Sequence, residues 1–168
     1  MPKCSTVTRV ILWLFLLSAL ILTGGGIFEH MVITPLWAGS PPESVTQWPY
    51  GGLQRRFFIV FSPTYYLFSL ALVVASWWMP QPQRKWALAA GLSGIIIGFA
   101  TFLFFIPILQ RTQVTRGAGL SGEEITALVN QFKTWNWARW VILISGWVAA
   151  LRALSLSPTA ESRRQGMT

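Results

Sequence analysis

The sequence predicts an all-α integral membrane protein, an antiparallel bundle of four transmembrane helices with an additional amphipathic helix before the last span. Composition is the first reason: 53% of the 168 residues are hydrophobic and 11% are charged, against about 25% charged in a soluble domain. The second is four long apolar runs, each near the roughly 20 residues that cross a bilayer. They leave no room for a second domain, so residues 1–168 are expected to form a single membrane domain.

The spans are expected at residues 10–28, 57–79, 86–109 and 138–156, with room for the first helix to continue to residue 36. The first run is longer than the apolar core of a secretory signal, about 7 to 15 residues, and we expect it to be retained. Residues 80–85 form so short a turn that the helices on either side must be antiparallel neighbours. The longer connections lie at the other end, together with Glu29 and His30.

The amphipathic helix is expected at about residues 122–136. Ser121 and Glu124 have the spacing of a capping box, in which each side chain satisfies a free backbone N–H group. The apolar positions then follow helical spacing, so this helix should run into the last span with little or no break. Those positions are Ile125, Leu128, Val129, Phe132 and Trp135.

The net charge of +8 is best explained by the lipid bilayer. The basic residues are dispersed over termini and loops, which indicates topology and contact with anionic lipid and argues against nucleic acid as a partner. Lys3 and Arg9 flank one end of the first span, whereas Glu29 and His30 flank the other. We therefore expect both termini to be cytoplasmic, in a bacterial inner membrane.

Two further patterns concern packing. Gly94 and Gly98 form a small-xxx-small motif, which permits close helix contact within the chain or with another subunit. Cys4 is the only cysteine, which excludes an intrachain disulfide and leaves S-acylation as an idea. Tryptophans are expected to form belts at the two membrane interfaces, at positions 37, 135, 137 and 140 and at positions 77, 78 and 86.

Glu29 and His30 are the first candidate functional residues. Titratable groups at membrane depth are costly and usually face the protein interior, which makes them functional candidates. On a helix the two side chains point about 100° apart, so one is expected to face the bundle and the other the loops. The alternative is that the helix ends near Phe28 and that both are ordinary interfacial residues.

Asn136 and Arg139 are the second pair of candidates. They are three residues apart and share a helix face, which also receives Phe132 and Trp135 from the preceding turn. Such a face can bind an anion, an enolate oxygen or a flat ring. Alternatively, Arg139 extends to the lipid headgroups. Whether Glu29 and Arg139 meet across the bundle stays open.

No metal or cofactor is expected. The chain has a single histidine and no aspartate, and its remaining carboxylates do not form a credible ligand set. The missing aspartate also excludes a Ser/His/Asp triad. A haem with one axial histidine stays open as an alternative.

The chain resembles the anthrone oxygenase-like membrane family over nearly its whole length. The resemblance lies in the four helices, the Gly-rich first helix with an acidic residue and a following Pro-Leu-Trp at 35–37, and the aromatic-x-x-x-Asn-x-x-Arg run at 132–139. It implies an oxygenase-like protein acting on a lipophilic aromatic substrate without a metal. His30 would remove a proton and Arg139 and Asn136 would stabilise the oxyanion, with Glu29 in the same site.

The alternative is a non-catalytic accessory subunit of a larger electron-transfer or photosynthetic membrane complex. An aromatic content of 14% and the glycine faces of two helices motivate it, because both provide lateral contact. Its partners would be other membrane proteins, or further copies of this chain in a homo-oligomer. A transporter is disfavoured because the four helices show no internal repeat.

Overall fold

The computed structural model describes residues 6–52 and 55–156. Every regular element in these residues is helical, and four helices are long and apolar enough to cross a membrane. The predicted all-helical fold with four such helices is therefore confirmed. Cys4 and Lys3 lie outside the described residues. The four long helices are Thr6–Ala38, Arg55–Ser76, Gln83–Val114 and Gly122–Ser155.

Two of the long helices contain π-helical segments. The first consists of α1 (Thr6–Phe28), η1 (Glu29–Ile33) and α2 (Thr34–Ala38), and it passes Phe28 without ending. The third consists of α5 (Gln83–Ala100), η2 (Thr101–Phe105), α6 (Ile106–Leu109) and η3 (Gln110–Val114). Pro35 and Pro107 each follow a π segment by two residues. Proline lacks an N–H group and its ring clashes with the preceding turn, and a wider turn there accommodates the ring.

The amphipathic segment and the last span form one helix, α7 (Gly122–Ser155), of 34 residues. The predicted capping box is present: the backbone N–H of Glu124 donates to Oγ of Ser121, and the Glu124 carboxylate accepts from the backbone N–H of Ser121 at 2.8 Å. By contrast, α4 (Arg55–Ser76) has only 22 residues. The other three long helices exceed by a third or more the roughly 20 residues needed to cross the hydrocarbon core.

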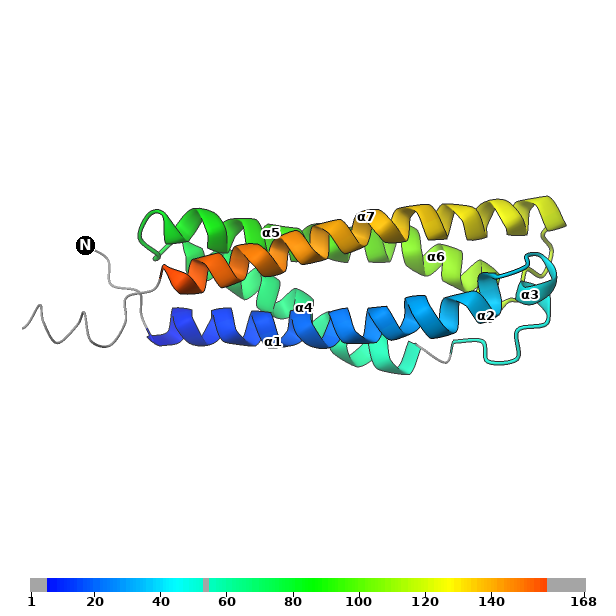
Figure 1. Ribbon diagram of the computed structural model, residues 1–168, viewed down its shortest axis with the longest axis horizontal. Coiled ribbons are helices and arrows are strands. Elements are labelled where there is room, and N and C mark those ends of the chain that lie inside the picture. Colours follow the sequence, from blue (N-terminus) through cyan, green and yellow to red (C-terminus); the bar gives the residue numbers. More distant parts are fainter. Residues whose placement is uncertain (1–5, 53–54, 157–168) are drawn as a thin grey trace, which may run out of the picture.

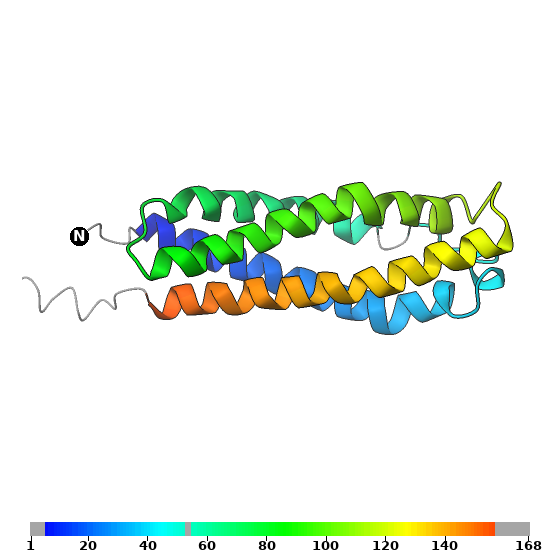
Figure 2. The same cartoon turned by 90° about the horizontal axis from the view of Figure 1, so that it is seen from above.

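The four long helices lie alongside one another (Figures 1 and 2), with α5 packed on α4 and α7, and α1 packed on the same two helices. The α4–α5 turn lies at the end of the bundle where α1 begins, and α2 and α3 (Glu43–Thr46) lie at the opposite end. At this opposite end, the neighbouring helices extend further outward than the first turn of α4. Gly51, in the connection before α4, lies against the backbone of Gln113, where a Cβ would come within 2.7 Å of the carbonyl oxygen.

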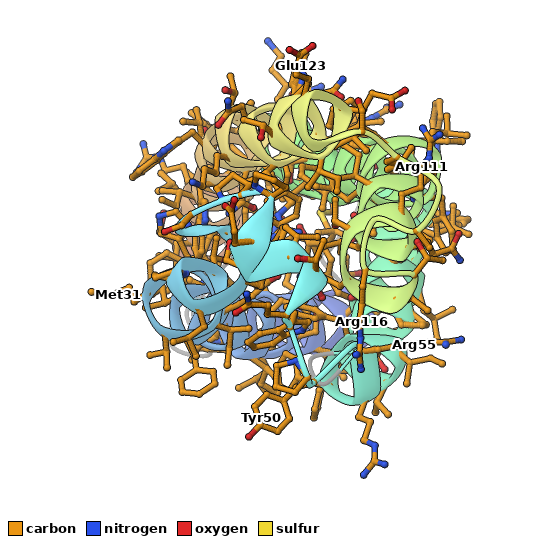
Figure 3. The ribbon with its side chains drawn as sticks, turned by 90° about the vertical axis from the view of Figure 1, so that its right-hand side faces the viewer. Met31, Tyr50, Arg55, Arg111, Arg116 and Glu123 are labelled. Carbon is orange, nitrogen blue, oxygen red and sulfur yellow. The ribbon has the colours of Figure 1, made fainter. Side chains whose placement is uncertain are left out.

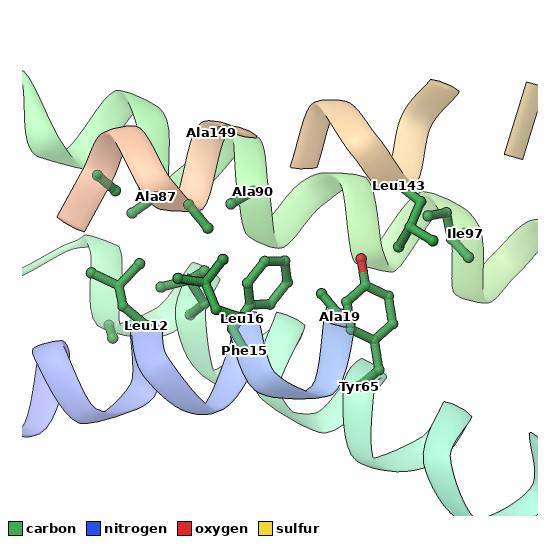
Figure 4. Close-up of a cluster of buried hydrophobic side chains, with 14 of the residues drawn as sticks. Leu12, Phe15, Leu16, Ala19, Tyr65, Ala87, Ala90, Ile97, Leu143 and Ala149 are labelled. Atoms are coloured by element: carbon green, nitrogen blue, oxygen red, sulfur yellow. The ribbon is translucent and has the colours of Figure 1, made fainter. Parts of the chain in front are cut away.

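Two hydrophobic cores follow from this arrangement. The larger one, drawn in Figure 4, joins α1, α4, α5 and α7 through residues such as Phe15, Tyr65 and Ala90. The smaller one lies at the α3 end and contains Trp37, which is fully buried with its ring centroid 5.2 Å from that of Phe132. The prediction that Trp37 belongs to an interfacial belt is therefore wrong. Its helix continues beyond the expected boundary and turns the indole toward α7.

The predicted glycine motif packs inside the chain. A side chain at Gly94 would collide with Ser69 of α4, whose Cβ would lie 2.7 Å from the added Cβ, and Gly98 faces Tyr66 of the same helix. Of the two alternatives, contact within the chain is therefore the one observed for these glycines.

Replacing Gly94 with alanine should lower the free energy of unfolding by about 1–3 kcal/mol, because overpacking displaces α4. SDS-driven unfolding of the purified protein, followed by circular dichroism, measures it. Gly24→Ala is the control: a Cβ at Gly24 meets no atom within 4 Å, and alanine should add up to about 1 kcal/mol through helix propensity. Equal effects of the two substitutions would contradict close packing at Gly94.

Candidate functional site

A cavity of about 430 Å³ lies inside the bundle, beside the N-terminal half of α4. Its wall comes from α1, α4, α7 and the third long helix, and all three π segments contribute, through Glu29 of η1, Thr101 of η2 and Gln110 of η3. The volume lies in the range of small-molecule sites, about 300–1,000 Å³. The lining is largely apolar, and its aromatic members are Phe58, Tyr66, Phe102, Phe105 and Trp140.

Glu29 and Arg139 face each other in this wall. The Arg139 Nη2 atom lies 3.6 Å from Glu29 Oε2, and Glu29 is only 3% exposed. The Arg139 guanidinium also lies 4.9 Å from the centre of the Phe105 ring. Glu29 and Arg139 therefore meet across the bundle, a point that the sequence left open, and their two charges form one ion pair. Because 3.6 Å exceeds the length of a hydrogen bond, about 2.7–3.2 Å, both groups keep donors or acceptors for a bound molecule.

His30 and Asn136 form a second contact between the same two elements. The side-chain nitrogen of Asn136 lies 3.3 Å from Nδ1 of His30, and it donates to that atom when His30 carries its proton on Nε2. Asn136 is 1% exposed, and the His30 ring meets Trp137 edge to face at 5.3 Å. The lining formed by the described residues does not include His30 or Asn136.

The structure thus brings all four predicted residues together between η1 and α7, but as two separate pairs. The adjacent positions 29 and 30 meet positions 139 and 136, respectively. As expected for neighbours about 100° apart on a helix, Glu29 faces the bundle interior and the cavity. His30 is half-buried and contacts the flank of α7, so the expectation that the second residue faces the loops is wrong. The four residues therefore play at least two different structural roles.

Sequence reasoning missed other polar residues of the cavity wall. Arg55 begins α4 and lines the cavity. Tyr66 lies opposite η2, where its hydroxyl is 3.1 Å from Oγ1 of Thr101, whose own hydroxyl donates to the carbonyl of Ile97. In the sequence, these residues could be recognised only as polar side chains inside or next to apolar spans. The sequence did not indicate which of these side chains line the same cavity.

Among the described residues, no three His, Cys, Asp or Glu side chains come together as a metal-binding group would require. Comparisons with protein-family models, curated proteins and solved structures found no match to this chain.

Proposed function

We propose that the chain is an oxygenase-like membrane protein that binds a lipophilic aromatic compound in this cavity and acts on it without a metal. In this proposal the four long helices cross a bacterial inner membrane as an antiparallel bundle, with both termini in the cytoplasm. The observation that carries the proposal is the buried ion pair of Glu29 and Arg139 in the wall of a largely apolar cavity. Ionisable groups held at membrane depth mark functional sites by default.

The wall suits a flat, hydrophobic ligand. Phe105 and Trp140 lie in the same wall as the ion pair, and aromatic side chains pack on ligand rings face to face or edge to face. Tyr66 and Thr101 add hydroxyl groups on the α4 side. A few polar groups in an apolar wall fix the orientation of a ligand that the apolar surface holds.

The charged pair supplies the chemistry that a phenolic substrate needs. Glu29 takes the proton from the substrate, and the Arg139 guanidinium stabilises the oxyanion that forms. The electron-rich anion then gives an electron to dioxygen, and the two radicals combine to a peroxide anion, which takes the proton back from Glu29 to give a hydroperoxide. For a ring methylene, loss of water gives a carbonyl, so that one oxygen atom enters the product and the other leaves as water.

His30 and Asn136 have a positioning role in this proposal. The resemblance gives proton removal to His30, but we assign it to Glu29, because Glu29 lines the cavity and His30 does not. The His30–Asn136 contact ties η1 to α7, next to the pair formed by Glu29 and Arg139. It therefore fixes the distance between the proton acceptor and the group that stabilises the anion.

Oxygen consumption tests the proposal. The protein in phosphatidylcholine nanodiscs should accelerate dioxygen uptake by 1,8-dihydroxyanthrone, with one anthraquinone formed per dioxygen, after treatment with a chelator. Nanodiscs without protein measure the spontaneous oxidation of the probe. A rate equal to that background, with the probe bound to the protein, would refute the proposed activity.

A further inference from the structure

Arg55 places a second arginine at the exposed edge of the cavity. It lies at the start of α4 and lines the same cavity as Glu29 and Arg139. Within residues 6–52 and 55–156, Glu29 is the only carboxylate in this wall. It is already paired with Arg139. The charged groups of the described wall are thus two cations and one anion. An excess positive charge beside an apolar cavity favours a ligand with its own negative charge.

The opening of the cavity is largely apolar, with Arg55 and Gln110 as its exposed polar residues. Ile59 of α4 and Phe102 of η2 both belong to the lining and are both 60% exposed, and Val114 at the end of η3 is exposed as well. The cavity therefore opens sideways, between α4 and the third long helix. The end-on view in Figure 3 shows these two helices as neighbours, with Arg55 at the rim of the bundle. In a bilayer such an opening faces lipid, so the ligand enters from the membrane.

We infer that the cavity selects a lipophilic hydroxyaromatic acid, whose carboxylate or second ionised hydroxyl pairs with Arg55 while its reacting hydroxyl lies at Glu29 and Arg139. This inference rests on the proposed function and narrows its substrate class. The apolar ring body occupies the space between the two guanidinium groups. A carboxylate binds a guanidinium through charge-assisted hydrogen bonds, roughly twice as strong as neutral ones.

A phospholipid is the competing occupant, since its phosphate can also pair with Arg55. The observations favour the aromatic acid. An acyl chain would leave the buried pair of Glu29 and Arg139 without a polar partner from the ligand, whereas a hydroxyaromatic compound places a hydroxyl there. Moreover, five of the lining side chains are aromatic, namely Phe58, Tyr66, Phe102, Phe105 and Trp140, and such rings pack best on another flat ring.

A matched pair of probes tests the inference by calorimetry in phosphatidylcholine nanodiscs. Empty nanodiscs provide the partition correction for 6-hydroxy-2-naphthoic acid and 2-naphthol, which differ only in the carboxylate; the hydroxyl and carboxylate of the acid lie at opposite ends of the ring system. The acid should bind the wild-type protein roughly tenfold more tightly, as expected for a hydrogen bond to a charged group. Arg55→Gln should remove most of this preference while keeping the affinity for 2-naphthol. Arg56→Gln is the control, because Arg56 is next in sequence and exposed like Arg55 but does not line the cavity.

Each outcome decides the inference. Equal binding of the two probes by the wild-type protein, or equal loss of preference in both variants, would overturn the acid specificity and leave the proposed function standing. Loss of the preference when phosphatidylglycerol is added would assign Arg55 to a lipid phosphate and also overturn it. If neither probe binds, the aromatic site itself is refuted, and the proposed function fails with it.

Discussion

Glutamine at position 29 should abolish the protein-dependent oxidation of 1,8-dihydroxyanthrone. A general base contributes about 10²–10⁴-fold to a rate, and Glu29→Gln removes the carboxylate that lines the cavity while keeping its size. Arg139 loses its partner in this variant, so the fold should be less stable, but the folded protein should still bind the probe because the apolar wall is unchanged. Dioxygen uptake at saturating probe measures the rate, and calorimetric titration measures the binding.

Two further variants test whether the loss of activity is specific to the carboxylate of Glu29. Glu43→Gln changes an exposed carboxylate in α3 and should leave the rate unchanged. His30→Gln should lower the rate only through positioning, and the remaining activity should keep the pH dependence of the wild-type protein. If His30→Gln abolishes oxidation and Glu29→Gln does not, proton removal belongs to His30, as the resemblance implies.

Much of the fold could be predicted because the signals are local. Long apolar runs identified four helices, and the capping box located the start of α7 within one residue. The helix lengths were harder to predict, because hydropathy indicates where a helix leaves the apolar region and not where the helix itself ends. The first and third long helices continue through π segments to Ala38 and Val114. Trp37 consequently lies in a core and not in a belt.

The site was only partly predictable, for a different reason. Glu29, His30, Asn136 and Arg139 stood out as polar groups next to apolar spans, and the structure places all four between η1 and α7. Their pairing depends on how two helices distant in sequence are rotated toward each other, which no local pattern records. Arg55 was missed because it lies at the boundary of a loop and becomes part of the site only through the tertiary fold.

The π segments affect both the helix lengths and the way in which the site residues pair. Each π turn adds a residue and widens the helix locally, and such turns are frequent at functional sites. In η1 the added residue lies where Glu29 and His30 diverge toward different partners on α7. In η2 and η3 it lies where the third long helix borders the cavity. The prolines that follow η1 and η2 thus help to shape the wall that carries the charged pair.

Replacing Arg139 with methionine should lower the free energy of unfolding by about 3–5 kcal/mol, the usual cost of leaving one charge of a buried pair alone. Glu29 is almost fully buried beside Arg139. The double variant Glu29→Gln/Arg139→Met should recover most of the loss, because removing both charges of a buried pair is often neutral. SDS-driven unfolding followed by circular dichroism measures both variants, with Arg152→Met, an exposed position on the same helix, as control. If the single and double variants are equally destabilised, the loss comes from packing at position 139, and the pair is not the reason that both charges are tolerated inside the bundle.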